Sequence, residues 1–304
     1  MEVFRSAADF KSAVKTTVTI GTFDGVHLGH RKIIDRLLLE GEGVATILTF
    51  FPHPRMILNG PGSVTLLNTI DERIQLIADT GVQNLIIHPF DDAFSKLTAD
   101  EFVRDILVGK LNAGKVVIGY DHRFGVNRTA GIDDLIQYGN KYGFTVEQIP
   151  AQEIEDVAIS STKIRTALVS GNLQLANSFL GYDYLLTGSV VKGKQLGRTI
   201  GYPTANIKIG EDYKLIPAHG VYLAWSMIDG EKRYGMMNIG NKPTVDGTTE
   251  SIEIYFFDFQ GDLYGKSIQL HLMERIRDER KFASVDELKE QLGRDEIFCR
   301  EMIG

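Results

Sequence analysis

Short apolar runs alternate with longer amphipathic runs along the first half of the chain. The apolar runs have the length of buried strands, and the amphipathic runs repeat their hydrophobic positions at the spacing of a helix. The strand-like runs lie at 17–23, 44–51, 82–90, 113–121 and 144–150, and the helix-like runs lie at 30–40, 71–81 and 132–143. This alternation predicts an α/β domain, with a parallel sheet and helices on both of its faces.

One further strand–helix step follows at 157–171, with the sequence "VAISSTKIRTALVSG". Residues 172–180 then show the pattern of a short helix. Gly181 follows directly, and glycine is the residue that most readily adopts the left-handed conformation found at helix ends. We therefore expect this helix to end the α/β part of the chain.

Past Tyr184 the pattern changes to short, often alternating strands with glycine, proline and aspartate turn signals between them. Asp-Gly pairs stand at 229–230 and 246–247, and this dipeptide is typical of tight hairpins. Little helical periodicity remains in this part of the sequence. The pattern predicts an antiparallel β unit that closes into a small barrel.

The end of the chain carries one more helix signal. Ser284 and Glu287 form a capping-box pattern before the run "LKEQL", which predicts a terminal helix. A length of 304 residues is typical of about two domains. With the change of pattern near 183–186, we expect one domain at 1–183 and a second at 184–304.

Composition and charge narrow the classes of function. A net charge of −7 argues against a broad basic surface for nucleic acid, so phosphate chemistry would concern small molecules. The one cysteine, Cys299, cannot form an intramolecular disulfide, and no apolar run approaches the roughly 18 residues that cross a bilayer. Without a signal-peptide pattern, we expect a cytoplasmic protein that does not bind membranes. The oligomeric state stays open.

The stretch "TFDGVHLGH" at 22–30 is the first candidate site. It follows a predicted strand and opens a predicted helix, at the sheet edge where open α/β sheets bind ligands. His27 and His30 are three residues apart and would share one face of the first helical turn, near free backbone N–H groups that suit a polyphosphate. Gly29 would let a phosphate approach the backbone. The alternative is a solvated helix start.

A second phosphate signal lies at 188–201, where glycines stand among Lys192, Lys194 and Arg198. Glycines allow a close backbone approach and the cations match phosphate charge, but a solvated hairpin has the same composition. The run "PTAN" strengthens the signal. Thr204 and Asn206 are two apart, so they would share one face of an extended strand.

A carboxylate marks a third candidate, in "SIEIYFFDF" at 251–259. Both faces of this predicted strand are mainly apolar, which predicts that the strand is covered on both sides. Glu253 would then be a partly desolvated carboxylate, a candidate general base. The alternative is a glutamate exposed at the rim of the barrel.

Five stretches together resemble one family. They are "GTFDGVHLGH", "TFFPHP" at 49–54, "GYDHRFG" at 119–125, "ISSTKIR" at 159–165 and "GRTIGYPTANI" at 197–207. The sequence resembles the bacterial bifunctional riboflavin kinase/FAD synthetase family over almost its whole length. The resemblance implies a Rossmann-like HxGH nucleotidyltransferase domain that transfers AMP from ATP to FMN. It also implies a barrel of the riboflavin kinase type that phosphorylates riboflavin, with Mg²⁺ and ATP used at both sites.

The resemblance also implies roles for residues of the adenylyltransferase site. His27 and His30 would contact the ATP phosphates, and Arg165 would close on the leaving pyrophosphate. Asp121 and Arg123 would lie on the adenosine side, next to His122, where similar sequences commonly have phenylalanine. The other implied binding residues are Gly21, Thr22, Phe23, Asp24, Gly29, Ser161 and Thr162. An ordinary helix N-cap is the alternative for 160–162.

For the kinase site the resemblance implies that Thr204 and Asn206 hold magnesium and the nucleotide phosphates, with Glu253 as the base. Arg277 would lie near the nucleotide and flavin, with a surface salt bridge as its alternative. The glycine-rich stretch would contribute Gly193, Lys194 and Gly197. We expect "NIGNKPT" at 238–244 to form a loop beside this site.

Other functions remain as alternatives. One is a monofunctional HxGH adenylyltransferase whose β domain only binds or senses flavin, and another is a flavin sensor without catalysis. A flavin sensor without catalysis would be expected to lose His27, His30, Arg165 or Glu253, and the chain keeps all four. An aminoacyl-tRNA synthetase also uses the H-x-G-H pattern, but this chain is short and acidic and lacks the lysine-rich partner motif of that class.

Overall fold

The computed structural model describes the whole chain except residues 40–42, 61, 151–158, 194–195 and 245–246. The chain forms two compact units, Met1–Ser161 and Thr162–Gly304. The boundary between these two units lies about 20 residues before the point near 183–186 where the sequence pattern changes. The functional boundary near 183–186 stays a prediction.

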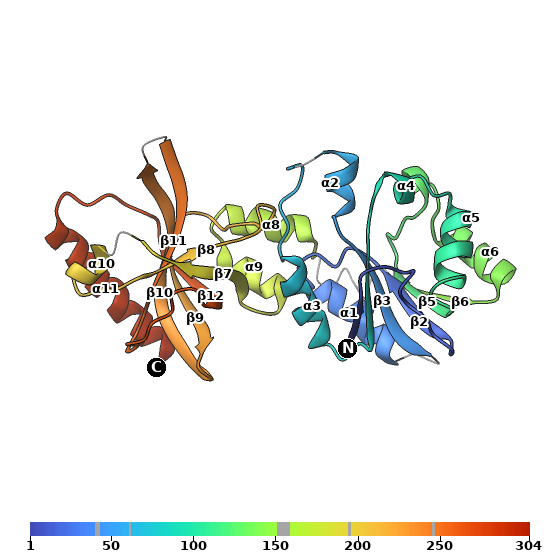
Figure 1. The fold of residues 1–304 in the computed structure, drawn as a ribbon, viewed down its shortest axis with the longest axis horizontal. Coiled ribbons are helices and arrows are strands. Elements are labelled where there is room, and N and C mark those ends of the chain that lie inside the picture. Colours follow the sequence, from blue (N-terminus) through green and yellow to red (C-terminus); the bar gives the residue numbers. More distant parts are fainter. Residues whose placement is uncertain (40–42, 61, 151–158, 194–195, 245–246) are drawn as a thin grey trace. The chain divides into compact units, whose positions relative to one another are not determined.

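The first unit is built on a six-stranded, wholly parallel sheet with the strand order β1-β4-β3-β2-β5-β6 (Figure 1). The strands are β1 (Glu2–Phe4), β2 (Thr16–Ile20), β3 (Val44–Phe50), β4 (Asn84–His88), β5 (Ala113–Gly119) and β6 (Thr145–Ile149). Five of them fall where the alternating pattern predicts strands. β1 was not predicted, because three residues carry no periodicity.

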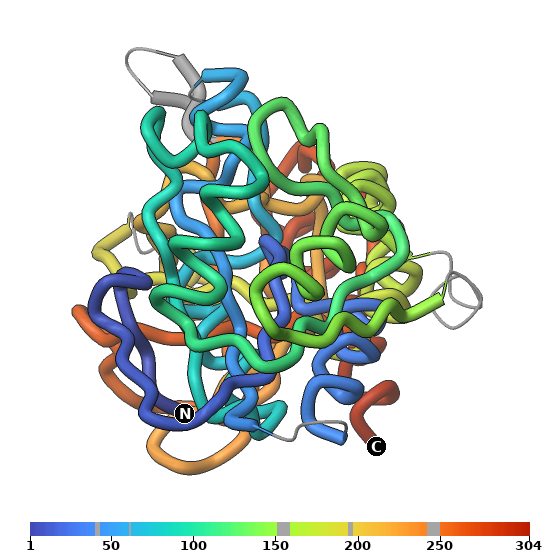
Figure 2. Tube along the Cα trace, turned by 90° about the vertical axis from the view of Figure 1, so that its right-hand side faces the viewer, coloured from blue at the N-terminus to red at the C-terminus, as the bar shows by residue number. Residues whose placement is uncertain are grey.

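Helices cover both faces of this sheet, as the alternation predicts. They are α1 (Leu28–Leu39), α2 (Pro54–Leu58), α3 (Ile70–Ala78), α4 (Asp92–Ser95), α5 (Ala99–Glu101), the π-helix η1 (Phe102–Val108), the 3₁₀ turn η2 (Val126–Arg128) and α6 (Ile132–Tyr142). In Figure 1, α1 and α3 lie on one side of the strands and α5 and α6 on the other. Figure 2 is viewed from the α6 side, so α6, in green, faces the reader.

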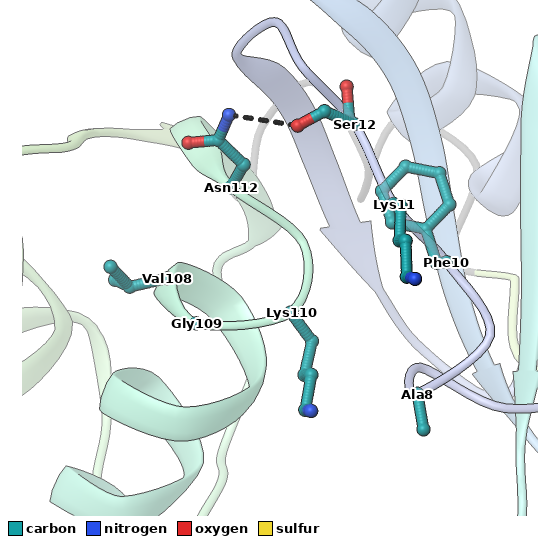
Figure 3. Close-up of a pocket in the computed structure, with 8 residues that line it drawn as sticks. All are labelled: Ala8, Phe10, Lys11, Ser12, Val108, Gly109, Lys110 and Asn112. Carbon is teal, nitrogen blue, oxygen red and sulfur yellow. Dashed lines mark hydrogen bonds between the residues drawn. The ribbon is translucent and has the colours of Figure 1, made fainter.

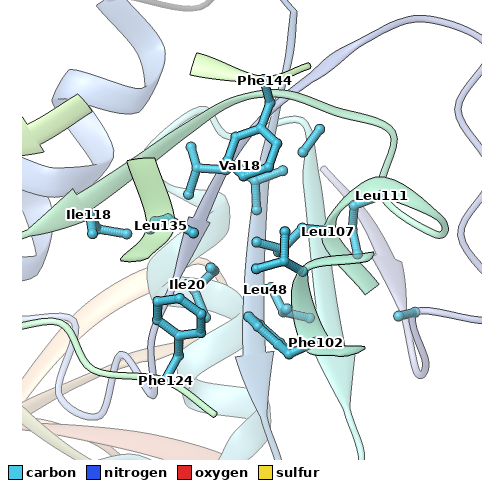
Figure 4. Close-up of a cluster of buried hydrophobic side chains, with 14 of the residues drawn as sticks. Val18, Ile20, Leu48, Phe102, Leu107, Leu111, Ile118, Phe124, Leu135 and Phe144 are labelled. Carbon is cyan, nitrogen blue, oxygen red and sulfur yellow. The ribbon is translucent and has the colours of Figure 1, made fainter. Parts of the chain in front are cut away.

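One apolar cluster joins the sheet to η1 and α6 (Figure 4). Val18 and Ile20 of β2 point to the same face as Leu48 of β3, because alternate residues of a strand share a face. Phe102 and Leu135 close the cluster from the helices. Burial of this face fixes β2 at the centre of the sheet, and with it the loop that follows β2.

The second unit is a closed antiparallel barrel with the strand order β10-β11-β8-β7-β12-β9. Its strands are β7 (Tyr184–Val191), β8 (Ala205–Lys208), β9 (Gly220–Ile228), β10 (Glu231–Thr244), β11 (Gly247–Phe256) and β12 (Ser267–Arg277), and its helices are α8 (Ser161–Val169), α9 (Leu173–Leu180), α10 (Leu196–Thr199) and α11 (Val285–Ile303). The predicted barrel and terminal helix are confirmed. The strand predicted at the start of 157–171 falls mostly outside the described residues.

The turn and cap signals have mixed outcomes. Asp229 and Gly230 form the β9–β10 turn with φ of 52° and 85°, while Asp246 of the second Asp-Gly pair lies outside the described residues. Gly181 ends α9 in the left-handed conformation, as predicted. Ser284 caps α11, but the Glu287 carboxylate accepts a hydrogen bond from the backbone of Ala283, so only half of the predicted capping box forms.

The expectation of a loop at 238–244 is wrong. β10 runs through this stretch and pairs with β11 as far as Thr244 and Gly247. Beyond Ile239, β10 has no pairing with β9, so this part of β10 is bonded on one side only. A strand edge tolerates the missing N–H of Pro243, which explains why glycine and proline did not prevent a strand here.

Candidate active sites

The loop between β2 and α1 has an unusual backbone. Phe23 and Val26 adopt positive φ angles of 48° and 35°, next to Gly25 at 91°. Such angles are costly for residues with side chains, above all for β-branched valine, and they persist only where the surroundings hold them. Both side chains are buried, Val26 completely, so the core pins this loop in its strained form.

Three neighbouring segments hold the same loop by hydrogen bonds. Thr49 at the end of β3 donates its hydroxyl to the carbonyl of Thr22 at 3.1 Å. Ser161 donates its hydroxyl to the carbonyl of Asp24 at 2.9 Å, and the backbone N–H of Leu67 donates to the Asp24 carboxylate at 2.9 Å. Ser161 therefore supports the loop with its side chain rather than capping its own helix.

The two histidines lie at the start of α1 and interact directly. The carbonyl of His27 accepts the N–H of Arg31, and Nδ1 of His27 accepts the backbone N–H of His30 at 3.3 Å, so His27 caps the helix. Because Nδ1 accepts this bond, the neutral ring of His27 carries its proton on Nε2. That tautomer presents a donor of the kind that a phosphate oxygen accepts.

The ring of His30 stacks on the ring of His27 with their centroids 3.6 Å apart. The ring of Phe23 also contacts His30, with the two centroids 5.1 Å apart. Burial lowers the pKa of His30 well below its ordinary value, and the nearby His27 and Arg73 lower it further. His30 is therefore neutral at pH 7. Its Nδ1 is buried and has no hydrogen-bond partner among the described residues. Buried polar atoms usually have a partner, so this nitrogen is a candidate for a hydrogen bond to a ligand.

A buried ion pair lies behind this loop. Asp24 and Arg73 of α3 are each about 1% exposed, with Nη2 of Arg73 3.7 Å from the Asp24 carboxylate. The sequence analysis placed Asp24 among the binding residues and did not single out Arg73. An arginine on a short amphipathic helix gives no sequence signal that it is buried. The structure gives Asp24 the task of holding the loop, and its contact with nucleotide stays a prediction.

The loop after β5 carries the predicted adenosine-side residues. Asp121 and Arg123 are exposed there, and β5 is the neighbour of β2 in the sheet, so both loops leave the same edge. His122 between them stacks near Phe124, with ring centroids 6.1 Å apart. Burial lowers the pKa of His122 to about 4, although Asp121 opposes the shift. His122 is thus a neutral ring at pH 7 in the folded unit.

A pocket of about 410 Å³ lies at the opposite, amino edge of the sheet (Figure 3). It is lined by the segments that precede β2 and β5, including Lys11 and Lys110, and Asn112 there hydrogen-bonds the carbonyl of Ser12 at 3.3 Å. The histidines follow the carboxyl end of β2. This pocket is therefore not part of the histidine site.

The remaining residues predicted for the first site have different positions. Gly21 and Thr22 begin the strained loop and are half-buried, and Gly29 is buried in the first turn of α1. Thr162 and Arg165 lie on α8 and belong to the second compact unit. Their action at the histidine site stays a prediction.

The second candidate site is assembled on the barrel. The hydroxyl of Thr204 donates to a carboxylate oxygen of Glu253 at 2.7 Å. Asn206 on β8 pairs directly with Glu253 on β11, so the two side chains share one face of the sheet. The structure thus brings together three oxygen-bearing side chains that are up to 49 residues apart in sequence.

Glu253 lies on the outer face of its strand. Ile252, Ile254 and Phe256 are almost completely buried on the inner face of the barrel, whereas Glu253 and Tyr255 are half-buried. The prediction that both faces of this strand are covered is confirmed for the inner face and, at Tyr255 and Phe257, for the part of the outer face that packs in the cluster with Cys299 of α11. Half-burial leaves the carboxylate open to a substrate.

The glycines before Thr204 make room for these side chains. A Cβ on Gly193 would lie 2.3 Å from the Asn206 amide, and one on Gly197 would lie 2.1 Å from the carbonyl of Tyr202 and 3.5 Å from the Thr204 hydroxyl. A side chain at Gly193 would therefore displace the Asn206 amide, and one at Gly197 would require a shift of the backbone. Lys194 lies outside the described residues.

Arg277 forms a salt bridge with α11. Its Nε and Nη2 donate to the Asp295 carboxylate at 2.7 to 3.0 Å, and Asp295 is 3% exposed. The salt bridge that was the alternative prediction for Arg277 is therefore present. Its partner Asp295 is buried, whereas a surface partner was expected. Its contact with nucleotide or flavin stays a prediction.

Comparisons with known proteins give matches over nearly the whole chain. A model of the FAD synthetase family matches residues 9–163, and a model of the riboflavin kinase family matches residues 180–303. The bifunctional riboflavin kinase/FMN adenylyltransferase of Escherichia coli (strain K12) is 39% identical over 291 residues, which cover 94% of this chain and 92% of that protein. The protein of the same description from Bacillus subtilis (strain 168) is 37% identical over 293 residues, which cover 92% and 90%.

A solved structure described as a macrolide-efflux protein from Streptococcus pneumoniae is also similar, with a TM-score of 0.88, 33% sequence identity and 98% of both chains covered. No helix in the described part of this chain is long and apolar enough to cross a membrane. The α/β unit and the barrel each match one of the two family models, and the curated relatives match nearly the whole chain. The chain belongs to the family of bifunctional riboflavin kinase/FMN adenylyltransferases.

Proposed function

We propose that the two candidate sites carry the two activities of the family: FMN adenylylation at His27 and His30, and riboflavin phosphorylation at Thr204, Asn206 and Glu253. The observation that carries the proposal is the convergence of these three oxygen-bearing side chains on one face of the barrel. We assign the first activity to residues 1–183 and the second to 184–304, in agreement with the two matched family models.

At the first site, a phosphate oxygen of FMN attacks the α-phosphorus of ATP and pyrophosphate leaves. No protein nucleophile is needed, so the site acts by positioning the reactants and stabilising the developing charge. The Nε2–H of His27 and the first N–H groups of α1 are donors for the phosphates. A neutral His30, kept neutral by burial, takes part as a hydrogen-bonding ring without adding a full charge. Arg165 is the cation that we assign to the pyrophosphate.

At the second site, the 5′-hydroxyl oxygen of riboflavin forms a bond to the γ-phosphorus of ATP, the bond from that phosphorus to the bridging oxygen breaks, and ADP leaves. The hydroxyl proton passes to the Glu253 carboxylate, which acts as the general base. Thr204 donates a hydrogen bond to one oxygen of this carboxylate and so fixes its direction.

The side chains of Thr204 and Asn206 fit a magnesium site. A hydroxyl oxygen and an amide oxygen are hard ligands of the kind that Mg²⁺ takes together with phosphates and water. When bound, the cation neutralises charge on the phosphates. Gly193 lets the backbone pass close to the Asn206 amide, and Gly197 lets it pass close to the carbonyl of Tyr202, beside Thr204.

We further propose a cytoplasmic protein whose partners are riboflavin, FMN and ATP, without nucleic acid or membrane. The support is the acidic composition and the free thiol of Cys299, which is buried. Burial raises the pKa of this thiol to about 12, so it stays protonated and unreactive.

The test is chromatographic separation of flavins after the full chain is incubated with ATP and Mg²⁺, starting either from riboflavin or from FMN. Replacing Glu253→Ala is expected to abolish FMN formation from riboflavin and to leave the conversion of FMN to FAD nearly unchanged. Replacing His30→Ala is expected to let FMN accumulate without FAD. Loss of both activities in either folded variant would contradict the assignment of two separate sites.

A wild-type protein that makes FMN but does not adenylylate it would leave the first site with another substrate. A wild-type protein that adenylylates FMN but does not phosphorylate riboflavin would favour the alternative of an adenylyltransferase with a flavin-binding barrel. Retention of flavin without any product would indicate a sensor.

A further inference from the structure

A row of residues crosses the barrel through the kinase site. The register pairs Asn206 of β8 with Glu253 of β11, Glu253 with Asn238 of β10, and Asn238 with Val221 of β9. Residues that are directly opposite in antiparallel strands share a face, with Cβ atoms about 4.5–5.5 Å apart. The register therefore places the Asn238 side chain beside Glu253, on the side away from Asn206.

The burial pattern of β10 supports this orientation. Met237 and Ile239 are completely buried inside the barrel, while Asn238 between them is half-buried. Met236, two residues earlier on the same face as Asn238, packs in the cluster with Cys299 of α11. Asn238 is thus on the outer face that also carries Glu253.

The carboxamide of Asn238 has no hydrogen-bond partner among the residues that the structure describes. A half-buried amide on the sheet, next to a carboxylate, costs free energy if it loses water and gains no partner. Val221, which lies opposite Asn238 in the register, and Met236, two residues earlier on the same face, offer only apolar side chains. A partner from outside the chain would remove this cost.

We propose that Asn238 binds the alcohol substrate of the kinase site: its carboxamide hydrogen-bonds a secondary hydroxyl of the polyol chain while Glu253 takes the proton of the terminal hydroxyl. This inference rests on the proposed role of Glu253. An amide offers both a donor and an acceptor, and a hydroxyl needs both. Two side chains opposite each other across a strand pair can therefore hold two hydroxyls of one substrate chain.

This contact would make Asn238 a specificity residue. It would select a polyol over a simple alkyl alcohol, because an analogue without secondary hydroxyls leaves the amide unpaired in the complex. Glu253 and the nucleotide side of the site do not distinguish the two substrates, since both carry the same terminal alcohol.

The experiment compares two substrates in the full chain: riboflavin and 7,8-dimethyl-10-(5-hydroxypentyl)isoalloxazine, which keeps the ring system and the terminal alcohol and lacks the secondary hydroxyls. Asn238→Leu has nearly the same shape and no hydrogen-bonding group. We expect it to lower kcat/KM for riboflavin about 10-fold, on the scale of one lost hydrogen bond to a substrate. We expect the two proteins to differ less than 3-fold on the hydroxypentyl analogue, with KM for ATP unchanged.

Asn241→Ala is the matched control, an exposed asparagine on the same strand, and it is expected to behave as wild type on both substrates. Fluorescence of Trp225 on β9, the one tryptophan of the chain, reports whether the barrel of each variant is folded. If Asn238→Leu unfolds the barrel, Asn238→Ser gives the same comparison with a smaller polar group, for which an intermediate loss on riboflavin alone is expected.

Equal losses on both substrates by a folded Asn238 variant would overturn the inference, because a structural role would affect them alike. The role of Glu253 is tested separately by Glu253→Gln, which should lose activity on both substrates. A fully active Glu253→Gln would refute the proposed base, whereas a selective loss on riboflavin in Asn238→Leu would still support the contact with the polyol.

Discussion

The two sites of this chain are built in different ways. The histidine site occupies one continuous loop and the first turn of α1, and its backbone is strained at Phe23 and Val26. The barrel site takes Thr204 and Asn206 from one segment and Glu253 from another, and only the pairing of β8 with β11 brings the two segments together. The first site is therefore local in sequence and depends on buried support, whereas the second depends on strand register.

Because of this difference, we expect different kinds of substitution to impair the two sites. A loop with positive φ angles needs its anchors, so changes at residues that never touch substrate should disturb it. A site on a closed barrel has its register fixed by many backbone hydrogen bonds. Single changes there should act mainly through the side chain that is removed.

The largest effect is expected from the support of the first site. Asp24→Ala leaves the guanidinium of Arg73 buried without its carboxylate, and breaking a buried ion pair in this way costs about 3–5 kcal/mol. We expect the free energy of unfolding of the first unit to fall by that amount, and FAD formation to fall with it. Chemical denaturation followed by circular dichroism measures the change.

Asp35→Ala is the control, because Asp35 lies exposed on α1 of the same unit. It should change the stability by less than about 0.5 kcal/mol. An Asp24→Ala variant as stable as the unmodified chain would show that the loop keeps its form without the buried ion pair. The conclusion that the first site depends on buried support would then be wrong.

The next effect concerns the barrel site. Thr204→Val keeps the shape of the side chain but removes the hydroxyl that donates to Glu253. A hydrogen bond to a charged group contributes about 1.5–3 kcal/mol, so kcat for riboflavin phosphorylation should fall roughly 10- to 100-fold. Thr204→Ser restores the hydroxyl and should recover most of this loss. A Thr204→Val enzyme with unchanged kcat would show that Glu253 needs no partner.

The strand, the turn and the helix around the two histidines could be predicted because they are contiguous in sequence. The turn at 22–27 lies between β2 and α1, as the order of the apolar and amphipathic runs predicts. Arg73 was missed because the burial of an arginine on α3 arises from tertiary packing beside the Asp24 loop, which leaves no pattern in its own neighbourhood.

At the second site the sequence predicted the residue types but not their geometry. Thr204 and Asn206 stand close together in the chain, while Glu253 joins them only through the pairing of β8 with β11. Asn238 was placed in a loop, because glycine and proline nearby suggested a turn. The long one-sided pairing of β10 with β11 decides the outcome there, and pairing over such a distance leaves no local signal.

A smaller effect is expected for pH. The folded state holds the pKa of His122 at about 4, below its ordinary value near 6.5, so the unfolded chain binds a proton first as the pH falls. The stability that a neutral His122 contributes is present above pH 6.5 and is lost as the pH falls toward 4. We expect His122→Phe to reduce the loss of stability between pH 7.5 and pH 5 by about 1–2 kcal/mol. His30 shifts in the same direction and remains in both proteins.

Urea denaturation of wild type and His122→Phe at the two pH values measures this difference. The same pH dependence in both proteins would mean that His122 has the same pKa in the folded and the unfolded chain. FAD formation at pH 7.5 by the variant also shows whether phenylalanine, common at this position in similar sequences, is compatible with the adenylyltransferase site.

The smallest effect tests how firmly the barrel fixes its register. Gly230 lies in the β9–β10 turn at φ 85°, and alanine in the left-handed region costs about 1–2 kcal/mol. Gly230→Ala should lower the stability of the second unit by about 1 kcal/mol. It should leave kcat for riboflavin phosphorylation unchanged, because nine register pairs between β9 and β10 hold Asn238 opposite Val221 regardless of the turn. Thermal unfolding monitored by Trp225 fluorescence and the flavin assay measure both outcomes, with Gly210→Ala, in open space, as control. A stable variant with reduced kcat would show that the turn, and not the barrel, sets the register of the site.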